Sequence, residues 1–305
     1  MNFQGVFWKS LGKHGRKPGD GEFFQPFGVC ASPDGTYLFI ADSGNDCVQV
    51  LTLPSGEYVR TIGGDDCVFK FPTFLCMSPD GNLLFVADSG HNCVHMLQTS
   101  DFQVVRTIGS QHADRTDVDG WFDYPQGMCL SPDGERLYVV DSENNRLLTF
   151  RVSDGAHLRT IMPTGSKSKS QTDGGFDWPC GMSMSVDGQF LFVADHHNCR
   201  IQVLRADNGA FVRKFGREGS GNCEFACVNG VCPTPVDDLL VIVDDGNHRV
   251  QVVRAADGQH VRTFGARGDG NGQFMRPMCV CWAVVAGEYT LVVTEAGNSR
   301  IQLFK

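Results

Sequence analysis

The sequence contains no long hydrophobic run. Its longest apolar stretch, residues 278–286, covers nine residues, whereas a membrane-spanning helix needs about 20. The N-terminus also lacks a basic segment followed by an apolar one, which is the pattern of a secretory signal. We therefore expect a chain that has no membrane partner and is not secreted.

Positive charge is in the minority. The 26 lysines and arginines face 35 aspartates and glutamates, which gives a net charge of -9 and an isoelectric point near 5.4. This balance disfavours general polyanion binding, although a local basic patch remains compatible with it. DNA is therefore not an expected partner.

Cysteine is plentiful and odd in number. The 13 cysteines cannot all pair within one chain, and a chain without a secretory signal is expected in a reducing compartment. We predict free thiols and a cytoplasmic location.

Glycine is also abundant, and it points to turns rather than helices. The chain has 36 glycines and 13 prolines in 305 residues, with no break in composition, so we expect one turn-rich all-β unit spanning residues 1–305. Its organisation is repetitive. An acidic residue ends an apolar stretch in six copies, at Asp42, Asp88, Asp141, Asp195, Asp244 and Glu295. A phenylalanine precedes the proline position by three residues, at Phe23, Phe69, Phe122, Phe176, Phe225 and Phe274.

Each repeat contains four short apolar stretches separated by turn sequences such as Ser-Pro-Asp-Gly, which predicts a four-stranded antiparallel blade. Six such units predict a six-bladed β-propeller. The sixth repeat ends after its third strand. Residues 7–12 match the fourth strand of the first repeat, so we expect residues 6–12 to complete the last blade and close the ring.

The repeats resemble NHL repeats, whose signature is similar to Phe-x-x-Pro-x-Gly followed by a strand and Ala-Asp-Ser-Gly-Asn-x-Arg-Ile-Gln-Val. Residues 41–45, 247–251 and 298–302 carry the second part of this motif. The resemblance implies an interaction domain like those of tripartite-motif and other RING-type ubiquitin ligases, some of which bind RNA. It also extends to a zinc lyase that makes peptide amides.

Length differences between repeats fall mainly in the connections between blades. Together with the turns after the acidic residues, these connections should share one face, and insertions on one face of a repeat protein mark its binding surface. We call it the variable face. Its candidate binding residues are Lys13, Arg16, Lys17, Asp42, Lys70, Asp88, His91, Asp114, Asp117, Asp119, Lys167, Lys169, His196, His197, His248, Arg267 and Arg276.

Four of the six acidic residues have an arginine five residues later. Such a pair can fix a turn through a bidentate contact, so we interpret these acids as structural. Cys47 and Cys93 occupy the arginine position after Asp42 and Asp88. We therefore expect those two carboxylates to be the better candidates for a ligand or a basic partner.

Metal and catalytic sites are not expected. Cys30, Cys76, Cys129, Cys232 and Cys281 share one repeat position, which indicates small core residues. Cys223 and Cys227 are close in sequence but lack a second pair at zinc-finger spacing. The channel positions after the proline hold no histidine for a zinc lyase, and only Gln126 and Asn229 there suit the calcium of a six-bladed lactonase.

The sequence thus predicts a monomeric, noncatalytic NHL propeller without a cofactor, which binds a protein through its variable face and serves a larger ubiquitin ligase. The alternative is single-stranded RNA binding, which needs basic spots beside aromatic stacking partners. Trp121, Tyr124 and Trp178 lie near the variable connections but flank the Phe-x-x-Pro motif, so we interpret them as core.

Overall fold

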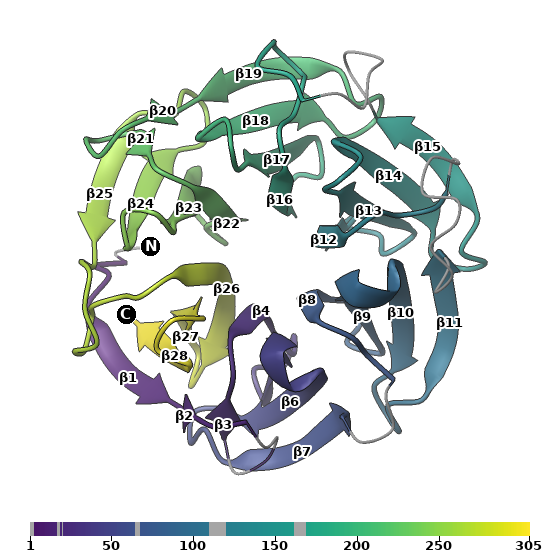
Figure 1. The fold of residues 1–305 in the computed structure, drawn as a ribbon, viewed down its shortest axis with the longest axis vertical. Coiled ribbons are helices and arrows are strands. Elements are labelled where there is room, and N and C mark those ends of the chain that lie inside the picture. Colours follow the sequence, from purple (N-terminus) through teal and green to yellow (C-terminus); the bar gives the residue numbers. More distant parts are fainter. Residues whose placement is uncertain (1–2, 17–18, 20, 65–67, 110–119, 162–168) are drawn as a thin grey trace.

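The computed structural model describes residues 3–16, 19, 21–64, 68–109, 120–161 and 169–305. These residues form six four-stranded antiparallel sheets arranged as the blades of a ring around a central axis (Figure 1). The predicted all-β six-bladed propeller is confirmed. Two short 3-10 helices are the only helices among the described residues, η1 (Ser43–Asn45) and η2 (Ser89–His91).

The blades are numbered from the first complete repeat. Blade 1 comprises β4 (Pro26–Ala31), β5 (Tyr37–Asp42), β6 (Cys47–Thr52) and β7 (Tyr58–Gly63). Blade 2 comprises β8 (Pro72–Met77), β9 (Leu83–Asp88), β10 (Cys93–Gln98) and β11 (Val104–Gly109). Blade 3 comprises β12 (Pro125–Leu130), β13 (Arg136–Asp141), β14 (Arg146–Arg151) and β15 (His157–Ile161). Blade 4 comprises β16 (Pro179–Met184), β17 (Phe190–Asp195), β18 (Arg200–Arg205) and β19 (Phe211–Phe215).

Blade 5 comprises β22 (Val228–Pro233), β23 (Leu239–Asp244), β24 (Arg249–Arg254) and β25 (His260–Phe264). Blade 6 comprises β26 (Pro277–Val285), β27 (Glu288–Glu295), β28 (Arg300–Phe304) and β1 (Phe7–Leu11). Two parallel strand pairs lie in the connections between blades, namely β2 (Lys13–His14) with β3 (Glu22–Phe23) and β20 (Arg217–Glu218) with β21 (Glu224–Phe225).

The N-terminal strand closes the ring as predicted. Strand β1 pairs antiparallel with β28, and its register places Leu11 opposite Ile301 and Phe7 opposite Phe304. The backbones of Val6 and Lys305 exchange two further hydrogen bonds of 2.9 Å. The first and last strands of the chain, β1 and β28, therefore lie side by side in the same blade (Figure 1).

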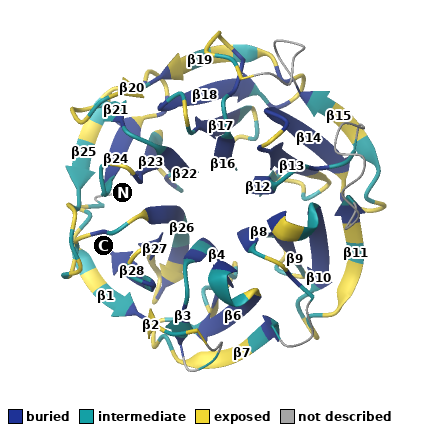
Figure 2. Cartoon of the chain, in the orientation of Figure 1, coloured by how far each residue is buried: buried dark blue, intermediate teal, exposed yellow. Residues whose placement is uncertain are grey.

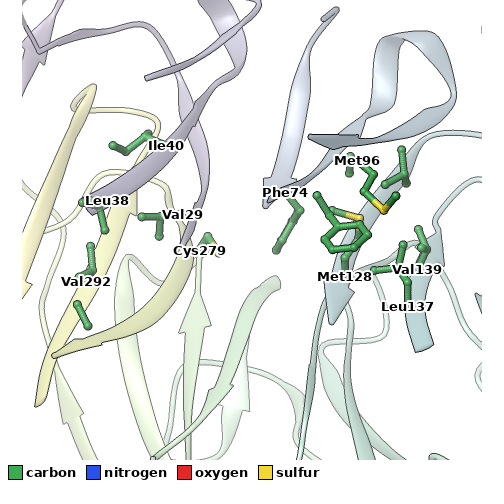
Figure 3. Close-up of a cluster of buried hydrophobic side chains, with 14 of the residues drawn as sticks. Val29, Leu38, Ile40, Phe74, Met96, Met128, Leu137, Val139, Cys279 and Val292 are labelled. Atoms are coloured by element: carbon green, nitrogen blue, oxygen red, sulfur yellow. The ribbon is translucent and has the colours of Figure 1, made fainter. Parts of the chain in front are cut away.

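The core lies between neighbouring blades. The second strand of each blade is buried on both faces, whereas the outermost strands are mostly exposed or half-buried (Figure 2). Figure 3 shows Leu38 of blade 1 beside Val292 of blade 6, and Phe74 of blade 2 beside Met128 of blade 3. Sheets that are apolar on both faces suit this radial arrangement.

The Phe-x-x-Pro-x-Gly motif has a packing role at both ends. Gly181 lets two innermost strands approach closely, because a Cβ atom there would collide with the carbonyl oxygen of Asn229 in the next blade. Phe69 is buried against Gly63, whose φ of 78° and missing side chain make room for the ring. Both contacts join consecutive blades, which explains why the motif recurs with the repeat.

Candidate functional site

A hydrogen-bonded network around the acidic residue organises the variable face of each blade. In blade 4, one oxygen of Asp195 accepts a 2.8 Å hydrogen bond from the backbone N–H of Asp177. The other oxygen accepts hydrogen bonds from the side chains of Asn198, Arg200 and Gln202, at 2.9, 2.7 and 3.0 Å. Burial raises the pKa of Asp195 above its ordinary value.

The predicted acid–arginine pairs are present, but with a different geometry. Arg200 uses only its Nε to contact Asp195, while its two Nη atoms donate to the carbonyl oxygens of Gln171, Thr172 and Gly175. The contact to the acid is therefore single rather than bidentate, because the rest of the guanidinium holds the connection between blades. The same acid–arginine contact occurs at 2.6 to 2.8 Å in blades 3, 5 and 6, for the pairs Asp141–Arg146, Asp244–Arg249 and Glu295–Arg300.

Asp42 and Asp88, the two acids without an arginine partner, lie beneath the variable face rather than on it. Both have no exposed surface, because the turn that follows each strand closes over the carboxylate. Asp42 accepts 2.7 Å hydrogen bonds from the side chains of Asn45 and Gln49. Burial raises the pKa of Asp42 to about 6.

Blade 2 departs from this network. One oxygen of Asp88 lies 2.9 Å from Nδ1 of His91 and 3.2 Å from Nε2 of His95, and the Cys93 Sγ lies 3.4 Å from the same His95 nitrogen. Asp88, Cys93 and His95 are the only group of potential metal ligands that the described residues bring within 4.8 Å of one another. Burial, and then the Asp88 carboxylate, raise the pKa of the Cys93 thiol. The sequence pattern marked Asp88 and His91 as binding candidates and Cys93 only as the replacement of an arginine, and it gave no role to His95.

Four aromatic rings and a histidine form a continuous row across blades 1 to 4 on the variable face, which we call the aromatic arc. Ring centroids are separated by 5.5 Å from Phe27 to Phe71, 6.4 Å to Tyr124, 5.7 Å to Trp178 and 5.8 Å to His197. His197 is exposed, and the four other rings are half-buried. Tyr124 and Trp178 are therefore not core residues, which corrects the sequence-based interpretation.

The preceding blades hold Tyr124 and Trp178 in place. Tyr124 and Trp178 adopt positive φ values of 59° and 55° immediately before the first strand of their blades, a conformation that is uncommon for large residues. Their backbone N–H groups donate 2.8 Å hydrogen bonds to the side-chain oxygens of Asn92 and Asn145, which belong to the turns of the preceding blades. The rings are thus presented by rigid turns rather than by long connections.

Carboxylates border the arc. Asp177, next to Trp178, lies 3.3 Å from Lys169 and 3.2 Å from His197. Glu143 is exposed, and its charge, after burial and Cys180, contributes to raising the pKa of Tyr124 to about 12. Two carboxylates thus lie beside the half-buried rings of the arc, and one of them is paired with Lys169.

The predicted basic residues do not gather into one patch among the described residues. Lys13 pairs with Glu22 at 3.0 Å, Lys169 pairs with Asp177, and Arg16 covers the ring of Phe24 at 4.3 Å. Lys70, Arg267 and Arg276 are exposed on separate connections, with Arg276 4.0 Å from Asp245. The remaining candidates lie outside the described residues, namely Lys17, Lys167, Asp114, Asp117 and Asp119.

The histidines of the variable face serve local contacts. His196 lies 2.9 Å from the carbonyl oxygen of Val228, and burial lowers its pKa. His248 lies 3.3 Å from the backbone nitrogen of Arg276. His197 alone joins the aromatic arc as an exposed ring.

The repeated cysteines line a cavity of about 560 Å³ at the opposite end of the innermost strands. Cys30 is buried, as predicted, whereas its four equivalents are half-buried. Burial raises the pKa of all five thiols, to about 12 for Cys232. All 12 described cysteines are free. Cys223 and Cys227 contact different surroundings, since the Cys223 thiol donates to Gly258 and Cys227 lies near Asp245.

Comparison with protein family models shows which family this propeller belongs to. The family model described as a lactonase with a seven-bladed β-propeller matches residues 109–270, more than half of the chain. The chain belongs to this β-propeller family. A second model, the NHL repeat, matches residues 69–96 in blade 2. Because this lactonase-family propeller has six blades, the match describes its fold, and its function has to be argued from the site.

Similar proteins carry the same repeat. NHL repeat-containing protein 2 is 30% identical to the chain in Bos taurus, 29% in Gallus gallus and 23% in Homo sapiens, each over 190 residues. These matches cover 60% of this lactonase-family propeller but only 21% of each relative. The chain thus aligns with about a fifth of the length of these relatives.

A solved structure has the same fold. Hydrazine synthase of Kuenenia stuttgartiensis superposes with a TM-score of 0.66 over 95% of this chain and 97% of its own, at 15% identity. This likeness concerns the fold alone. In the described part of this lactonase-family propeller, no helix has the length and apolar character needed to cross a bilayer.

Proposed function

We propose that the chain is a noncatalytic recognition domain that binds a basic segment of a partner protein along the aromatic arc. The proposal is carried by the continuity of the arc, in which half-buried rings on four successive blades lie within 6.4 Å of their neighbours. Aromatic residues held in fixed orientations supply binding energy at little cost in side-chain entropy.

The charge beside the arc favours a basic protein segment over RNA. Asp177 and Glu143 lie next to Trp178 and Tyr124, and a carboxylate beside an aromatic face suits a lysine or arginine side chain. The same carboxylates would repel phosphate groups, and Lys169 already pairs with Asp177. The finer role of recruiting substrates to a ubiquitin ligase rests on the resemblance to tripartite-motif propellers.

Fluorescence anisotropy with two labelled nonapeptides tests the proposal, one alternating arginine and leucine and the other alternating glutamate and leucine. We expect the basic peptide to bind, and Trp178→Ala to weaken that binding at least about tenfold. Trp8→Ala is the matched control, because Trp8 lies on the outer strand β1. Equal weakening by the two variants, or preference for the acidic peptide, would contradict the proposal.

A salt titration with random single-stranded RNA examines the alternative. Protein binding through a few contacts should respond moderately to ionic strength, whereas RNA binding should weaken steeply as counterions are released. Submicromolar RNA binding at physiological salt, lost when alanine replaces the basic candidates, would favour the RNA function. Those candidates are Lys13, Arg16, Lys17, Lys167 and Lys169.

A further inference from the structure

Three polar positions surround the buried acid of each blade, three, five and seven residues after it. Blades 4, 5 and 6 place asparagine, arginine and glutamine there, for example at Asn198, Arg200 and Gln202. Blade 1 keeps Asn45 and Gln49 around Cys47, and blade 3 keeps asparagine and arginine but has leucine at the last position. Only blade 2 replaces all three, with His91, Cys93 and His95.

The replacements convert a set of hydrogen-bond donors into a set of transition-metal ligands. A carboxylate, a thiolate and imidazoles are the ligands that zinc takes in proteins, usually four in a tetrahedron. A hydrogen-bonding role would account for histidine in place of asparagine or glutamine. Cys93 alone does not decide between the two roles, because Cys47 occupies the same position in blade 1 between Asn45 and Gln49. The combination of Cys93 with His95 beside Asp88 is what supplies a metal-binding set.

The distances fit a tetrahedral ion. Zinc–nitrogen, zinc–oxygen and zinc–sulfur bonds of about 2.0, 2.0 and 2.3 Å give tetrahedral edges of about 3.3 Å between nitrogen and oxygen and about 3.5 Å between nitrogen and sulfur. The His95 Nε2 lies 3.2 Å from the Asp88 oxygen and 3.4 Å from the Cys93 Sγ. We propose that Asp88, Cys93 and His95 bind one Zn²⁺ ion, with a water molecule as the fourth ligand and His91 hydrogen-bonded to the Asp88 carboxylate on the solvent side.

The surroundings support ligation. The second ring nitrogen of His95 lies 3.0 Å from the Thr107 hydroxyl, and the second oxygen of Asp88 accepts a 2.9 Å hydrogen bond from the backbone N–H of Lys70. Partners of this kind orient metal ligands and raise their affinity. The site is closed on the inside, because Asp88, Cys93 and His95 are buried. The His91 side chain is 27% exposed and marks the path to solvent. Binding transfers the Cys93 thiol proton to water as the zinc–sulfur bond forms.

Cobalt titration of the full chain, stripped with a chelator and kept reduced, tests the proposal. Co²⁺ in a tetrahedral site with a thiolate gives visible d–d bands and a near-ultraviolet sulfur-to-cobalt charge-transfer band. We expect both bands to saturate at one equivalent and to be displaced by Zn²⁺. Cys93→Ser should remove the charge-transfer band, and His95→Gln should weaken cobalt binding at least about a hundredfold.

Two features keep the test specific. His95→Gln installs the glutamine found in four other blades, so it should fold, and circular dichroism with the urea midpoint checks that it does. Cys47→Ser is the matched control, because Cys47 occupies the same position beside Asp42 but without histidines, and it should leave both bands unchanged. Absence of the bands from the wild-type chain, their loss in Cys47→Ser, or their persistence in His95→Gln would overturn the site.

Discussion

Replacing Leu11 with alanine tests how firmly the N-terminal strand closes the ring. Leu11 is 5% exposed, lies opposite Ile301 in the β1–β28 ladder, and packs against the turn at Gly56 in blade 1. Its side chain therefore packs both within blade 6 and at the boundary between blade 6 and blade 1. A buried leucine replaced by alanine costs about 2 to 5 kcal/mol, from lost transfer free energy and a residual cavity.

The repeat supplies an internal standard for that cost. Ile161 occupies the same position in blade 3, is 3% exposed and packs against Gly209 just as Leu11 packs against Gly56. If β1 is docked as firmly as a strand in the middle of the chain, Leu11→Ala and Ile161→Ala should lower the free energy of unfolding by similar amounts, about 3 kcal/mol each. Val6→Ala, at a 61% exposed residue, should change it by less than about 0.5 kcal/mol.

Urea unfolding, followed by far-ultraviolet circular dichroism and by tryptophan fluorescence, measures these differences in free energy. Coincident transitions in the two signals would show that unfolding is two-state. A cost for Leu11→Ala below about 0.5 kcal/mol beside a full cost for Ile161→Ala would refute firm closure. Deleting residues 1–12 should have a larger effect, because it also exposes the edge of β28. A truncated chain that melts within about two degrees of the full one would refute the same reasoning.

The fold could be predicted because the information is repeated. A single Ser-Pro-Asp-Gly turn is weak evidence, but this turn occurs in three copies, the Phe-x-x-Pro spacing in five and the acid in all six. The ring follows from six blades that are apolar on both faces and cannot be buried alone. The fourth strand of blade 6 was found by the match between the residues before Gly12 and those before Gly63, which the structure confirms.

The aromatic arc could not be predicted, because it depends on backbone conformation. Sequence spacing places Tyr124 and Trp178 between the buried Phe and the proline, where a core role is the natural interpretation. Both residues adopt positive φ values instead, and the side-chain oxygens of Asn92 and Asn145 that accept their backbone hydrogen bonds belong to other blades. No local pattern encodes either feature.

The cluster of Asp88, His91, Cys93 and His95 in blade 2 is visible in the sequence, but its residues suggest a metal site only when they are considered together. His91 and Cys93 were each noted alone, and His95 was not considered. Aligning the positions three, five and seven residues after the acid would have shown that all three change together. Departures from a repeat carry more functional information than its shared residues, because the shared residues serve packing that every blade needs.

Two further predictions concern buried titratable groups. The thiols that line the cavity should react slowly with an alkylating reagent in the absence of denaturant, since burial raises their pKa. Mass spectrometry should find these cysteines largely unlabelled, namely Cys30, Cys76, Cys129, Cys232 and Cys281. Rapid labelling of most of them would contradict the prediction. Asp42 should make the protein less stable as pH rises from about 4 to about 6. Its pKa rises from 3.8 to about 6 on folding, so the folded state keeps a proton that the unfolded state has lost, and the stabilisation present below pH 4 disappears as Asp42 ionises. The difference in unfolding free energy between wild type and Asp42→Asn should fall by up to about 3 kcal/mol over that interval and stay constant above about pH 7. A difference that rises with pH would mean that hydrogen bonds from Asn45 and Gln49 outweigh burial.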